Sequence, residues 1–394
     1  MDISEVKLSH KIKNDKYTEY VYDTFDIQDR ETTSVTIPMR FGNLDSFDWN
    51  VGVIYGSSGC GKSTILKQLG GVRDINFDTE KSLISNFDWL SPEDAGRVLT
   101  SIGLSSIPTW LRPYRLLSNG EKYRAELAYL VSSAKDGDII LIDEYTSVVD
   151  RDVAKAMSFA LQKYIRRENK KIILASCHYD IMEWLMPDWT VSPEKDGGAL
   201  VRGEWLRQGR PEIRLRVSRT EVEAWDLFKR HHYLTEDVNK SYIFLLFEWN
   251  DRPVAMGVIG RQIGRNDVKS FRGSRTVVLP DYQGLGIGSQ ISNFMGGICT
   301  HLGGKYYTKT VNPALGEYRN KHTDLWKPTA FNGKLRIDDN DDSVVYKSLK
   351  QRPSYCHQYV GPKVEGYEDL LESIDKVRMM SRVDLDLVRN FWEV

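Results

Sequence analysis

Short apolar runs in the first half of the chain predict buried strands. Three of them end at glycine or polar positions: Val51–Tyr55, Ile139–Ile142 and Ile172–Ser176. Runs of this length are typical of strands that are buried on both faces of a parallel sheet. The stretches between them have helical spacing, and this alternation predicts a mainly parallel sheet with covering helices. Two further strands are predicted nearer the start, at Glu19–Tyr22 and Ser34–Ile37.

A second alternating pattern begins near Ile213 and continues towards the end of the chain. It predicts strands at Tyr242–Glu248, Val254–Ile259, Thr276–Leu279 and Tyr306–Val311, and a strand-like region at Val344–Val360. It predicts helices at Thr220–Tyr233, Ser289–Leu302 and Tyr367–Trp392. This second pattern again indicates an α/β fold.

A glycine-rich stretch between the two patterns, Ser192–Gly209, predicts a linker. The length of 394 residues also favours two or three domains rather than one. We therefore predict a first domain at residues 1–192, a linker at 193–211, a second domain at 212–361 and a C-terminal helical extension at 362–394.

Composition excludes several classes of protein. The chain holds 54 basic and 55 acidic residues, so its net charge predicts neither a nucleic acid nor an acidic partner, and any basic surface must be local. Its four cysteines are scattered, which argues against a disulfide framework or a zinc ribbon. No apolar run of about 20 residues is present, and the first residues are polar, so we expect a cytoplasmic protein that does not cross a membrane.

The strand at Val51–Tyr55 leads into a complete phosphate-loop pattern. Glycines allow successive backbone N–H groups to point at phosphate oxygens, and the following helix offers its positive end to the same anion. Lys62 is expected to reach the terminal phosphates, and the Ser63 hydroxyl to bind Mg²⁺. The nucleotide-binding residues predicted here are Gly56, Ser57, Gly59, Cys60, Gly61, Lys62, Ser63 and Thr64.

Two carboxylates, Asp143 and Glu144, follow the apolar run Ile139–Ile142. Ligands of open α/β sheets bind at the carboxyl ends of the strands. Asp143 is therefore predicted to hold Mg²⁺ and Glu144 to act as the general base for the attacking water. Taken alone, the same pattern also fits a strand that ends in a solvated acidic turn.

Further motifs make this half of the chain resemble the ATP-binding-cassette (ABC) ATPases. Leu117-Ser118-Asn119-Gly120-Glu121 resembles the LSGGQ signature of that family, from which Asn119 and Glu121 depart. Ser147-Val148-Val149-Asp150 resembles its D-loop, and His178 its switch histidine. The resemblance implies that Ser118 and Gly120 bind the γ-phosphate of an ATP held by a second subunit. It therefore implies a homodimer that sandwiches ATP head to tail.

Two departures from that family point to a protein without a transporter partner. The interval between Lys62 and Asp143 is short for a transporter ATPase, and no clear Q-loop glutamine is present. The helical region that docks on transporter membrane helices is therefore expected to be reduced.

The second half contains a strand, a turn with proline and three alternating glycines, and then a helix, at Arg275–Gly288. This arrangement builds an anion site from backbone amides and a helix N-terminus, or else a purely structural turn. It resembles motif A of the GNAT acyltransferases, which binds the pyrophosphate of acetyl-CoA. Together with the resemblance of the first half to ABC ATPases, it implies a P-loop NTPase of the ABC type followed by a GNAT-fold mixed α/β domain. The acetyl-CoA-binding residues that it implies are Val277, Val278, Gln283, Gly284, Gly286 and Gly288.

Acyl transfer to an amine needs a base for the amine and an acid for the thiolate. Asn312-Pro313-Ala314, followed by Tyr318, resembles the N-x-x-A…Y segment of the GNAT family, one residue short, so Tyr318 is the candidate acid. His232, in Arg230–Leu234, is the candidate base, although His231 and His232 also fit a structural helix end or metal ligands. His232, Tyr233 and Asp281 further resemble, weakly, the phage Mom family that modifies adenine in DNA.

Two basic segments interleave arginine with aromatic residues, a composition that suits nucleic acid. A solvated face with contacts to CoA phosphates explains them equally well. Their members are Arg202, Trp205, Arg207, Arg210, Arg214, Arg216 and Arg219, and Arg261, Arg265, Lys269, Phe271, Arg272 and Arg275.

The motifs together predict an ATP-hydrolysing enzyme fused to an acetyl-CoA-dependent N-acyltransferase that modifies a nucleic acid (a tRNA or a DNA base) under control of ATP. Two alternatives stay open. One is a nucleic-acid-binding assembly ATPase whose GNAT fold is not catalytic, and the other is Mom-like modification of a DNA base.

Overall fold

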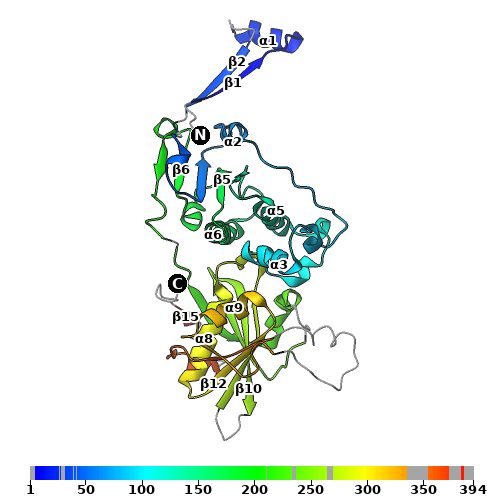
Figure 1. The fold of residues 1–394 in the computed structure, drawn as a ribbon, viewed down its shortest axis with the longest axis vertical. Coiled ribbons are helices and arrows are strands. Elements are labelled where there is room, and N and C mark those ends of the chain that lie inside the picture. The colour runs from blue at the N-terminus through cyan, green and yellow to red at the C-terminus, as the bar shows by residue number, and fades with distance from the viewer. Residues whose placement is uncertain are drawn as a thin grey trace. The chain divides into compact units, whose positions relative to one another are not determined.

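The computed structural model describes residues 5–25, 27, 32–38, 40, 42–209, 211–232, 237–263, 269–334, 354–371 and 383–385. The chain folds into two compact units, whose elements are labelled in Figure 1. Unit 1 consists of Met1–Phe77 and Glu126–Pro211, and unit 2 of Asp78–Ala125 and Glu212–Val394. This division differs from the predicted first domain at residues 1–192, because Asp78–Ala125 groups with the C-terminal half of the chain.

Unit 1 is built around a five-stranded sheet with the order β4-β5-β3-β6-β7. The first four strands are parallel and β7 is antiparallel to β6. The strands are β3 (Val51–Tyr55), β4 (Ile139–Ile142), β5 (Lys171–Ser176), β6 (Trp189–Val191) and β7 (Leu200–Arg202). All three predicted apolar strands are confirmed. The predicted linker is wrong in part, because its residues Leu200–Arg202 pair with β6 as an edge strand.

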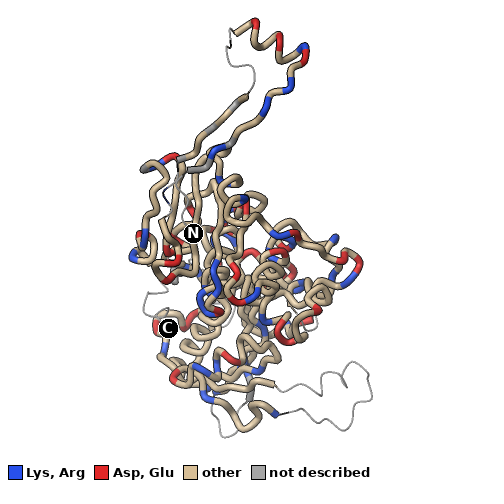
Figure 2. Tube along the Cα trace, turned by 45° about the horizontal axis from the view of Figure 1, so that its top comes forward, with Lys and Arg blue, Asp and Glu red and all other residues tan. Residues whose placement is uncertain are grey.

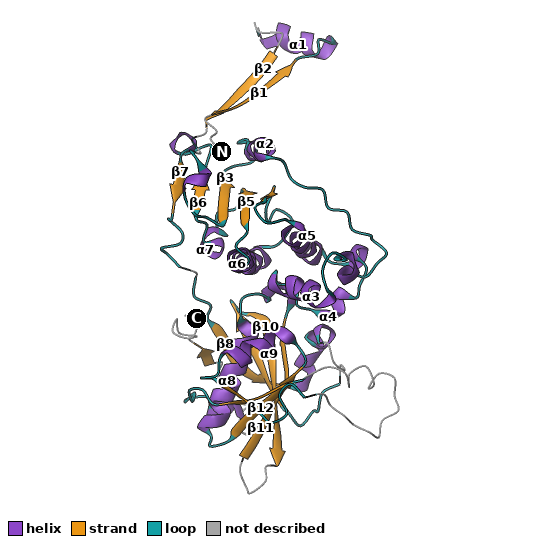
Figure 3. Ribbon diagram, in the orientation of Figure 1, coloured by secondary structure: helices purple, strands orange, loops and turns teal. Residues whose placement is uncertain are grey.

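The helices of unit 1, labelled in Figure 3, are α2 (Lys62–Leu69), the part of α5 (Asn119–Ser133) from Glu126 onward, α6 (Arg151–Arg167) and α7 (Met182–Leu185), with short turns η1 (Leu44–Ser46) and η4 (Asp196–Gly198). The side chain of Asp150 caps α6 by accepting from the N–H groups of Asp152 and Val153. The core combines residues of the sheet and α2, including Ile54, Ile65 and Trp189. Each such side chain contributes roughly 1.5–3 kcal/mol by leaving water.

A hairpin with a helix precedes this sheet: β1 (Glu5–Lys11), α1 (Lys16–Phe25) and β2 (Thr32–Pro38). The predicted strand at Ser34–Ile37 is confirmed, but the one at Glu19–Tyr22 is wrong, because these residues lie in α1. Asp15 explains the difference, since its carboxylate accepts from the N–H groups of Tyr17 and Thr18 and so starts a helix.

Asp188 ties three segments of unit 1 together, with only 13% of its side chain exposed. It accepts from the backbone N–H groups of Asn50 and Val51, at 2.8 Å each, and forms an ion pair with Arg166 at 2.9 Å. We expect Asp188→Ala to lower the free energy of unfolding by about 3 kcal/mol, because it leaves a half-buried cation and two N–H groups without their acceptor. Urea unfolding of the full chain measures this, with the exposed Glu168→Ala as control. Equal stability of the two variants would contradict the prediction.

Unit 2 contains an eight-stranded sheet with the order β13-β14-β12-β11-β10-β9-β8-β15. Neighbours are antiparallel except β11 and β12, which are parallel and joined through α8 (Ile287–His301). The strands are β8 (Leu215–Thr220), β9 (Ile243–Trp249), β10 (Arg252–Ile263), β11 (Lys269–Val278), β12 (Lys305–Thr310), β13 (Trp326–Pro328), β14 (Tyr355–Tyr359) and β15 (Val383–Leu385). With a mainly parallel sheet in one unit and a mainly antiparallel sheet in the other, the predicted α/β fold class is confirmed.

The helical elements of unit 2 come from both of its chain segments. They are η2 (Leu83–Asn86), α3 (Pro92–Ser101), α4 (Ile107–Trp110), η3 (Tyr114–Leu116), η5 (Val222–Leu227), η6 (Lys229–His231), η8 (Pro280–Tyr282), α8, α9 (Pro313–Lys321) and η9 (Glu368–Leu371). Among the described residues, none of the helices combines the length and apolar character that crossing a bilayer requires.

Two predictions for this half need correction. The helix expected at Thr220–Tyr233 is two short 3₁₀ segments over its described residues, η5 and η6. The helix expected at Tyr367–Trp392 is wrong at Val383–Leu385, which is a strand paired with β8. Alternation of apolar and acidic residues there has the period of a strand. Of the region at Val344–Val360, residues up to Pro353 lie outside the described residues, and Tyr355–Tyr359 is the strand β14.

Candidate functional site

The phosphate loop of unit 1 has the backbone that an anion cradle needs. Gly59 and Gly61 have φ angles of 84° and 97°, a region that residues with a side chain rarely adopt. A Cβ atom on Gly61 would also lie 2.0 Å from Ile37 Cδ1. α2 begins at Lys62, directly after the loop, and the Lys62 ammonium donates to the carbonyl oxygens of Gly56 (2.9 Å) and Ser57 (2.6 Å). The glycine cradle, the helix N-terminus and the lysine together fit the phosphates of a nucleoside triphosphate.

The predicted acidic residues and the switch histidine reach the same edge of the sheet as this loop. β3, β5 and β4 are parallel neighbours, so their carboxyl ends share one edge. The phosphate loop follows β3, Asp143 and Glu144 follow β4, and His178 follows β5. The topology therefore brings the phosphate cradle, two carboxylates and an imidazole to one edge. Ser63 and Asp143 are the two oxygen donors there that suit Mg²⁺.

The turn after β4 is held in an uncommon backbone conformation. Glu144 and Thr146 have φ angles of 48° and 69°, while Tyr145 between them is fully buried. The Tyr145 N–H donates to Ala175 O at 2.7 Å, and its carbonyl accepts from the Ser176 hydroxyl at 2.9 Å. Positive φ in a residue other than glycine costs energy, so the surrounding hydrogen bonds must hold this turn. This anchoring leaves the Glu144 side chain at the exposed edge.

Thr146 is a residue of this site that the sequence did not reveal. Its hydroxyl lies 3.0 Å from His178 Nδ1 and so fixes the orientation of the imidazole. Burial and the charge of Arg151 lower the pKa of His178, so the ring is neutral at neutral pH. A neutral imidazole can donate one hydrogen bond to a phosphate oxygen while the other nitrogen accepts from Thr146.

Glu194 also belongs to the site, although it lies in the segment predicted as a linker. Its carboxylate accepts from the Ser57 backbone N–H at 2.7 Å and from the Ser57 hydroxyl. These hydrogen bonds hold the pKa of Glu194 below its ordinary value, so it is ionised at neutral pH. A carboxylate thus occupies donors that the phosphate loop would offer to a nucleotide.

We expect Glu194→Ala to bind ATP several-fold more tightly than the wild type. The substitution removes a negative charge beside the phosphates and frees the Ser57 donors. Calorimetric titration with ATP measures the change. Glu204→Ala, which removes an exposed carboxylate from the same stretch of chain, serves as the control. Equal affinities in the two variants would show that Glu194 does not compete with the nucleotide.

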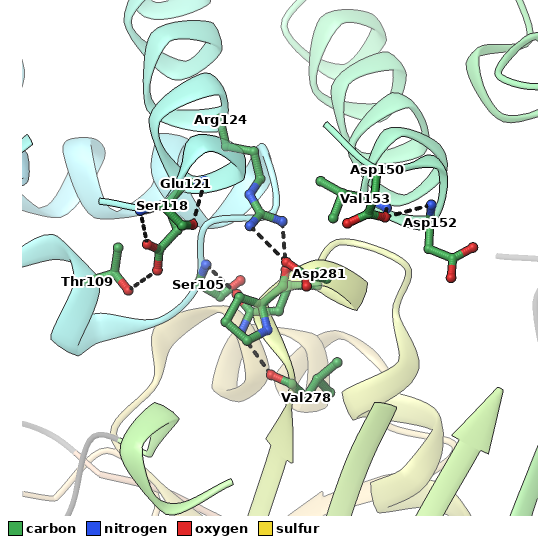
Figure 4. A network of polar contacts seen from close by, with 12 residues as sticks. Ser105, Thr109, Ser118, Glu121, Arg124, Asp150, Asp152, Val153, Val278 and Asp281 are labelled. Atoms are coloured by element: carbon green, nitrogen blue, oxygen red, sulfur yellow. Dashed lines mark hydrogen bonds and ion pairs between the residues drawn. The ribbon is translucent and has the colours of Figure 1, made fainter. Parts of the chain in front are cut away.

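In unit 2, the signature segment forms a reciprocal cap at the start of α5 (Figure 4). The Ser118 hydroxyl accepts from the Glu121 N–H at 3.3 Å, and a Glu121 carboxylate oxygen accepts from the Ser118 N–H at 2.9 Å. Thr109 donates to the other carboxylate oxygen at 3.0 Å. The spacing Ser-x-x-Glu is the capping-box pattern and could have been predicted from the sequence. The departure of Glu121 from the family signature therefore has a structural role.

The Glu121 carboxylate is buried but remains an acceptor of hydrogen bonds. Burial acts to raise its pKa, but hydrogen bonds from Ser118 and Thr109 and the charge of Arg112 outweigh burial, and the pKa lies below its ordinary value. A charged carboxylate is therefore hydrogen-bonded to the backbone of Ser118, one of the residues predicted to meet the γ-phosphate.

The predicted acyl-CoA turn follows β11. Gly284 and Gly286 have φ angles of 90° and 80°, and α8 begins immediately after Gly286, so the turn presents its backbone N–H groups and a helix N-terminus together. Pairing of β11 with β12 extends from Ser270 to Gly273, although β11 continues to Val278. The carboxyl end of β11 therefore separates from its parallel neighbour at the position where the resemblance places acetyl-CoA.

The side chain of Gln283 has another task in this turn. Its Nε2 donates to Val278 O at 2.9 Å, and its Oε1 accepts from the Ser105 N–H at 2.7 Å. Gln283 therefore stabilises the turn, and the predicted anion contacts would come from the backbone of Gly284, Gly286 and Gly288. Val277 is buried, and a Cβ on Gly288 would lie 3.5 Å from Val278, which is ordinary van der Waals contact, so this helix start packs against β11.

Tyr318 lies on α9, which follows β12, and Asn312 caps that helix. The Tyr318 hydroxyl accepts from Asn293 Nδ2 of α8 at 3.1 Å, and its ring lies 4.0 Å from the ring of His322. Burial raises the pKa of Tyr318, so the hydroxyl keeps its proton at neutral pH. The position suits a proton donor held between two helices.

His232 does not have the chemistry expected of a base. Its side chain packs against Trp225, and only 8% of the residue is exposed. Burial and the charge of Arg275 lower its pKa to about 3. General base catalysis favours a pKa near the working pH, so this imidazole is a weak proton acceptor.

Many arginines of the two basic segments have partners within unit 2. Arg214 pairs with Glu212, Arg216 with Asp251, Arg261 donates to Leu371 O, and Arg275 donates to Asp237 O. Figure 2 shows Lys and Arg interspersed with Asp and Glu along the trace. Arg210 and Arg265 lie outside the described residues.

Among known proteins, the chain is similar to several solved structures. No family model and no curated protein matches the chain. CbiO1 from Clostridium perfringens, part of the ABC transporter complex CbiONQ, is 19% identical (TM-score 0.30) over 40% of this chain and 76% of its own. The dimeric ATP-binding cassette MJ0796, bound to ADP and phosphate, is 14% identical (0.35) over 51% and 97%. Naa50 from Arabidopsis thaliana, in complex with a bisubstrate CoA analogue, is 16% identical (0.27) over 36% and 97%.

Proposed function

We propose that the chain is an ATP-hydrolysing enzyme that carries an acetyl-CoA-dependent N-acyltransferase in the same polypeptide. The observation that carries the proposal is the shared sheet edge of unit 1, where the phosphate loop, Asp143, Glu144 and His178 meet. Few other functions need this set of groups at one edge.

In the nucleotide site, each residue has a distinct task. The loop amides and Lys62 bind the phosphates, and Ser63 and Asp143 hold Mg²⁺, which neutralises phosphate charge when bound. Glu144 accepts a proton from the attacking water, and His178 donates to the terminal phosphate. Ser118 and Gly120 complete the site from a second copy of the chain, so hydrolysis requires a head-to-tail dimer.

In unit 2, the backbone of the Gly284–Gly288 turn would bind the pyrophosphate of acetyl-CoA. Tyr318 gives its proton to the departing thiolate as the acceptor amine attacks the acyl carbon. Since His232 is too weak a base, the amine proton leaves through another group or water.

The acceptor is proposed to be a nucleic acid, delivered or released under control of ATP. Because the thioester supplies the driving force of transfer, ATP has the task of controlling access of the acceptor. Mass spectrometry of nucleosides from cells that express the wild type or Lys62→Ala tests this. A modified nucleoside present only with the wild type supports the proposal, and its absence in both excludes nucleic acid as the acceptor.

The two activities are tested separately on the purified full chain. Phosphate release from Mg-ATP tests the ATPase, and calorimetric titration with acetyl-CoA tests the acyl donor site. Hydrolysis without any binding of acetyl-CoA would reduce the proposal to an ATPase whose second sheet is a recognition module.

A further inference from the structure

A buried arginine on the signature helix holds the acyl-CoA turn. Arg124 on α5 is only 1% exposed, yet its Nη1 donates to Pro280 O at 2.7 Å, and its Nη2 lies 3.6 Å from Asp281 Oδ1 (Figure 4). Pro280 and Asp281 form η8, immediately before the Gln283–Gly288 turn. A hydrogen bond from a buried cation to a carbonyl is among the stronger protein contacts, so it fixes the position of η8.

A second contact joins the same two chain segments. The Ser105 N–H, in the loop between α3 and α4, donates to Gln283 Oε1 at 2.7 Å, and Gln283 Nε2 in turn donates to Val278 O. Gln283 therefore bridges the segment Asp78–Ala125 to the end of β11. Arg124 thus holds η8, which precedes the acyl-CoA turn, and Ser105 holds Gln283, the first residue of the turn.

The same turn of α5 carries a residue of the predicted nucleotide signature. Glu121 lies three residues before Arg124, so the two share one turn of α5. The Glu121 carboxylate accepts hydrogen bonds from the Ser118 N–H and the Thr109 hydroxyl in the cap described above. One helical turn therefore connects the residues proposed to meet a γ-phosphate with the residue that holds the acyl-CoA turn.

We propose that Arg124 is a positioning residue that couples nucleotide binding to acyl-CoA binding. This inference rests on the proposed function. A γ-phosphate that accepts from the Ser118 hydroxyl orients the same side chain that caps the Glu121 N–H, so nucleotide binding acts on the first turn of α5. Arg124 transmits that change to Pro280, and hence to the N–H groups of the turn that follows. Coupling of this kind is reciprocal, so acetyl-CoA must change the affinity for ATP by the same factor.

The experiment measures the dissociation constant of acetyl-CoA with and without saturating AMP-PNP, by calorimetry on the full chain. In the wild type, we expect AMP-PNP to change this constant by about fivefold or more. In Arg124→Met, AMP-PNP should change the dissociation constant of acetyl-CoA by less than about twofold. Arg124→Lys keeps a donor for Pro280 O and should retain part of the wild-type change. Arg115→Ala, which breaks the exposed Arg115–Glu80 pair in the same segment, is the control and should behave as the wild type.

Loss of the buried arginine could also weaken unit 2, so a gentler variant accompanies it. Asp281 is 55% exposed in its side chain, and Asp281→Ala removes the ion pair without emptying a buried site. It should reduce the coupling factor with little effect on thermal unfolding. The ratio of the two dissociation constants separates coupling from stability, because a purely structural defect weakens acetyl-CoA binding equally with and without nucleotide.

Two results overturn the inference while leaving the proposed function intact. One is a wild type that binds both ligands without any effect of one on the other. The other is an Arg124→Met variant that is folded and keeps the wild-type factor. Failure of the wild type to bind acetyl-CoA or AMP-PNP at all would instead overturn the proposed function.

Discussion

Glu144→Gln is expected to slow ATP hydrolysis by about 10²–10⁴-fold, the contribution typical of a general base. Glutamine has the same shape as glutamate but cannot accept a proton from water. The turn that carries it should be unchanged, since Tyr145 and Thr146 hold it through Ala175 and His178. Steady-state phosphate release measures the loss.

Binding of ATP to Glu144→Gln should stay within about threefold of wild type, because the loop amides and Lys62 are untouched. Since bound ATP is not consumed, light scattering with Mg-ATP should also detect a stable dimer. Glu168→Gln, on an exposed turn after α6, is the matched control and should hydrolyse ATP normally. A Glu144→Gln chain with wild-type hydrolysis would exclude Glu144 as the base, and a chain that stays monomeric would exclude the sandwiched dimer.

Tyr318→Phe is expected to lower kcat for acyl transfer by about 10²–10⁴-fold, the contribution typical of a general acid. The substitution removes only the hydroxyl, which accepts one hydrogen bond from Asn293. Loss of that bond should cost about 1 kcal/mol of stability, and the ring should keep its contact with His322. Thiol release from acetyl-CoA in the presence of an amine acceptor measures the effect.

The pH profile gives Tyr318→Phe a second readout. Because burial raises the pKa of Tyr318, its hydroxyl stays protonated to a higher pH than that of an exposed tyrosine. Wild-type activity should therefore persist at alkaline pH. The affinity for acetyl-CoA should change by less than about threefold, since the turn that binds it is intact. Tyr307→Phe, on β12, is the control. Wild-type kcat in Tyr318→Phe would assign proton donation to another group.

The elements that were predicted best are those encoded by contiguous residues. β3, β4 and β5 follow from uninterrupted apolar runs, and α8 follows from its glycine turn and apolar spacing. The secondary-structure predictions failed where a helix-capping residue, or an alternation of apolar and polar residues, was overlooked. Asp15 starts a helix at residues expected to form a strand, and alternating residues at Val383–Leu385 form a strand within an expected helix.

By itself, the sequence determined which residues make up the proposed nucleotide site. The phosphate loop and the acidic pair are local patterns, and the rule that parallel strands share a carboxyl edge was enough to bring them together. The Ser118–Glu121 cap was equally local, although it was not predicted.

Only the tertiary structure decided which distant residues contact each proposed site. Glu194 reaches Ser57, Thr146 orients His178, and Arg124 and Ser105 hold the acyl-CoA turn, each across a long interval of chain. The segment Asp78–Ala125 likewise groups with the C-terminal half, far from it in sequence. A local pattern specifies its own backbone, whereas a contact between distant residues depends on how sheets and helices pack. Spacing along the chain does not encode that packing.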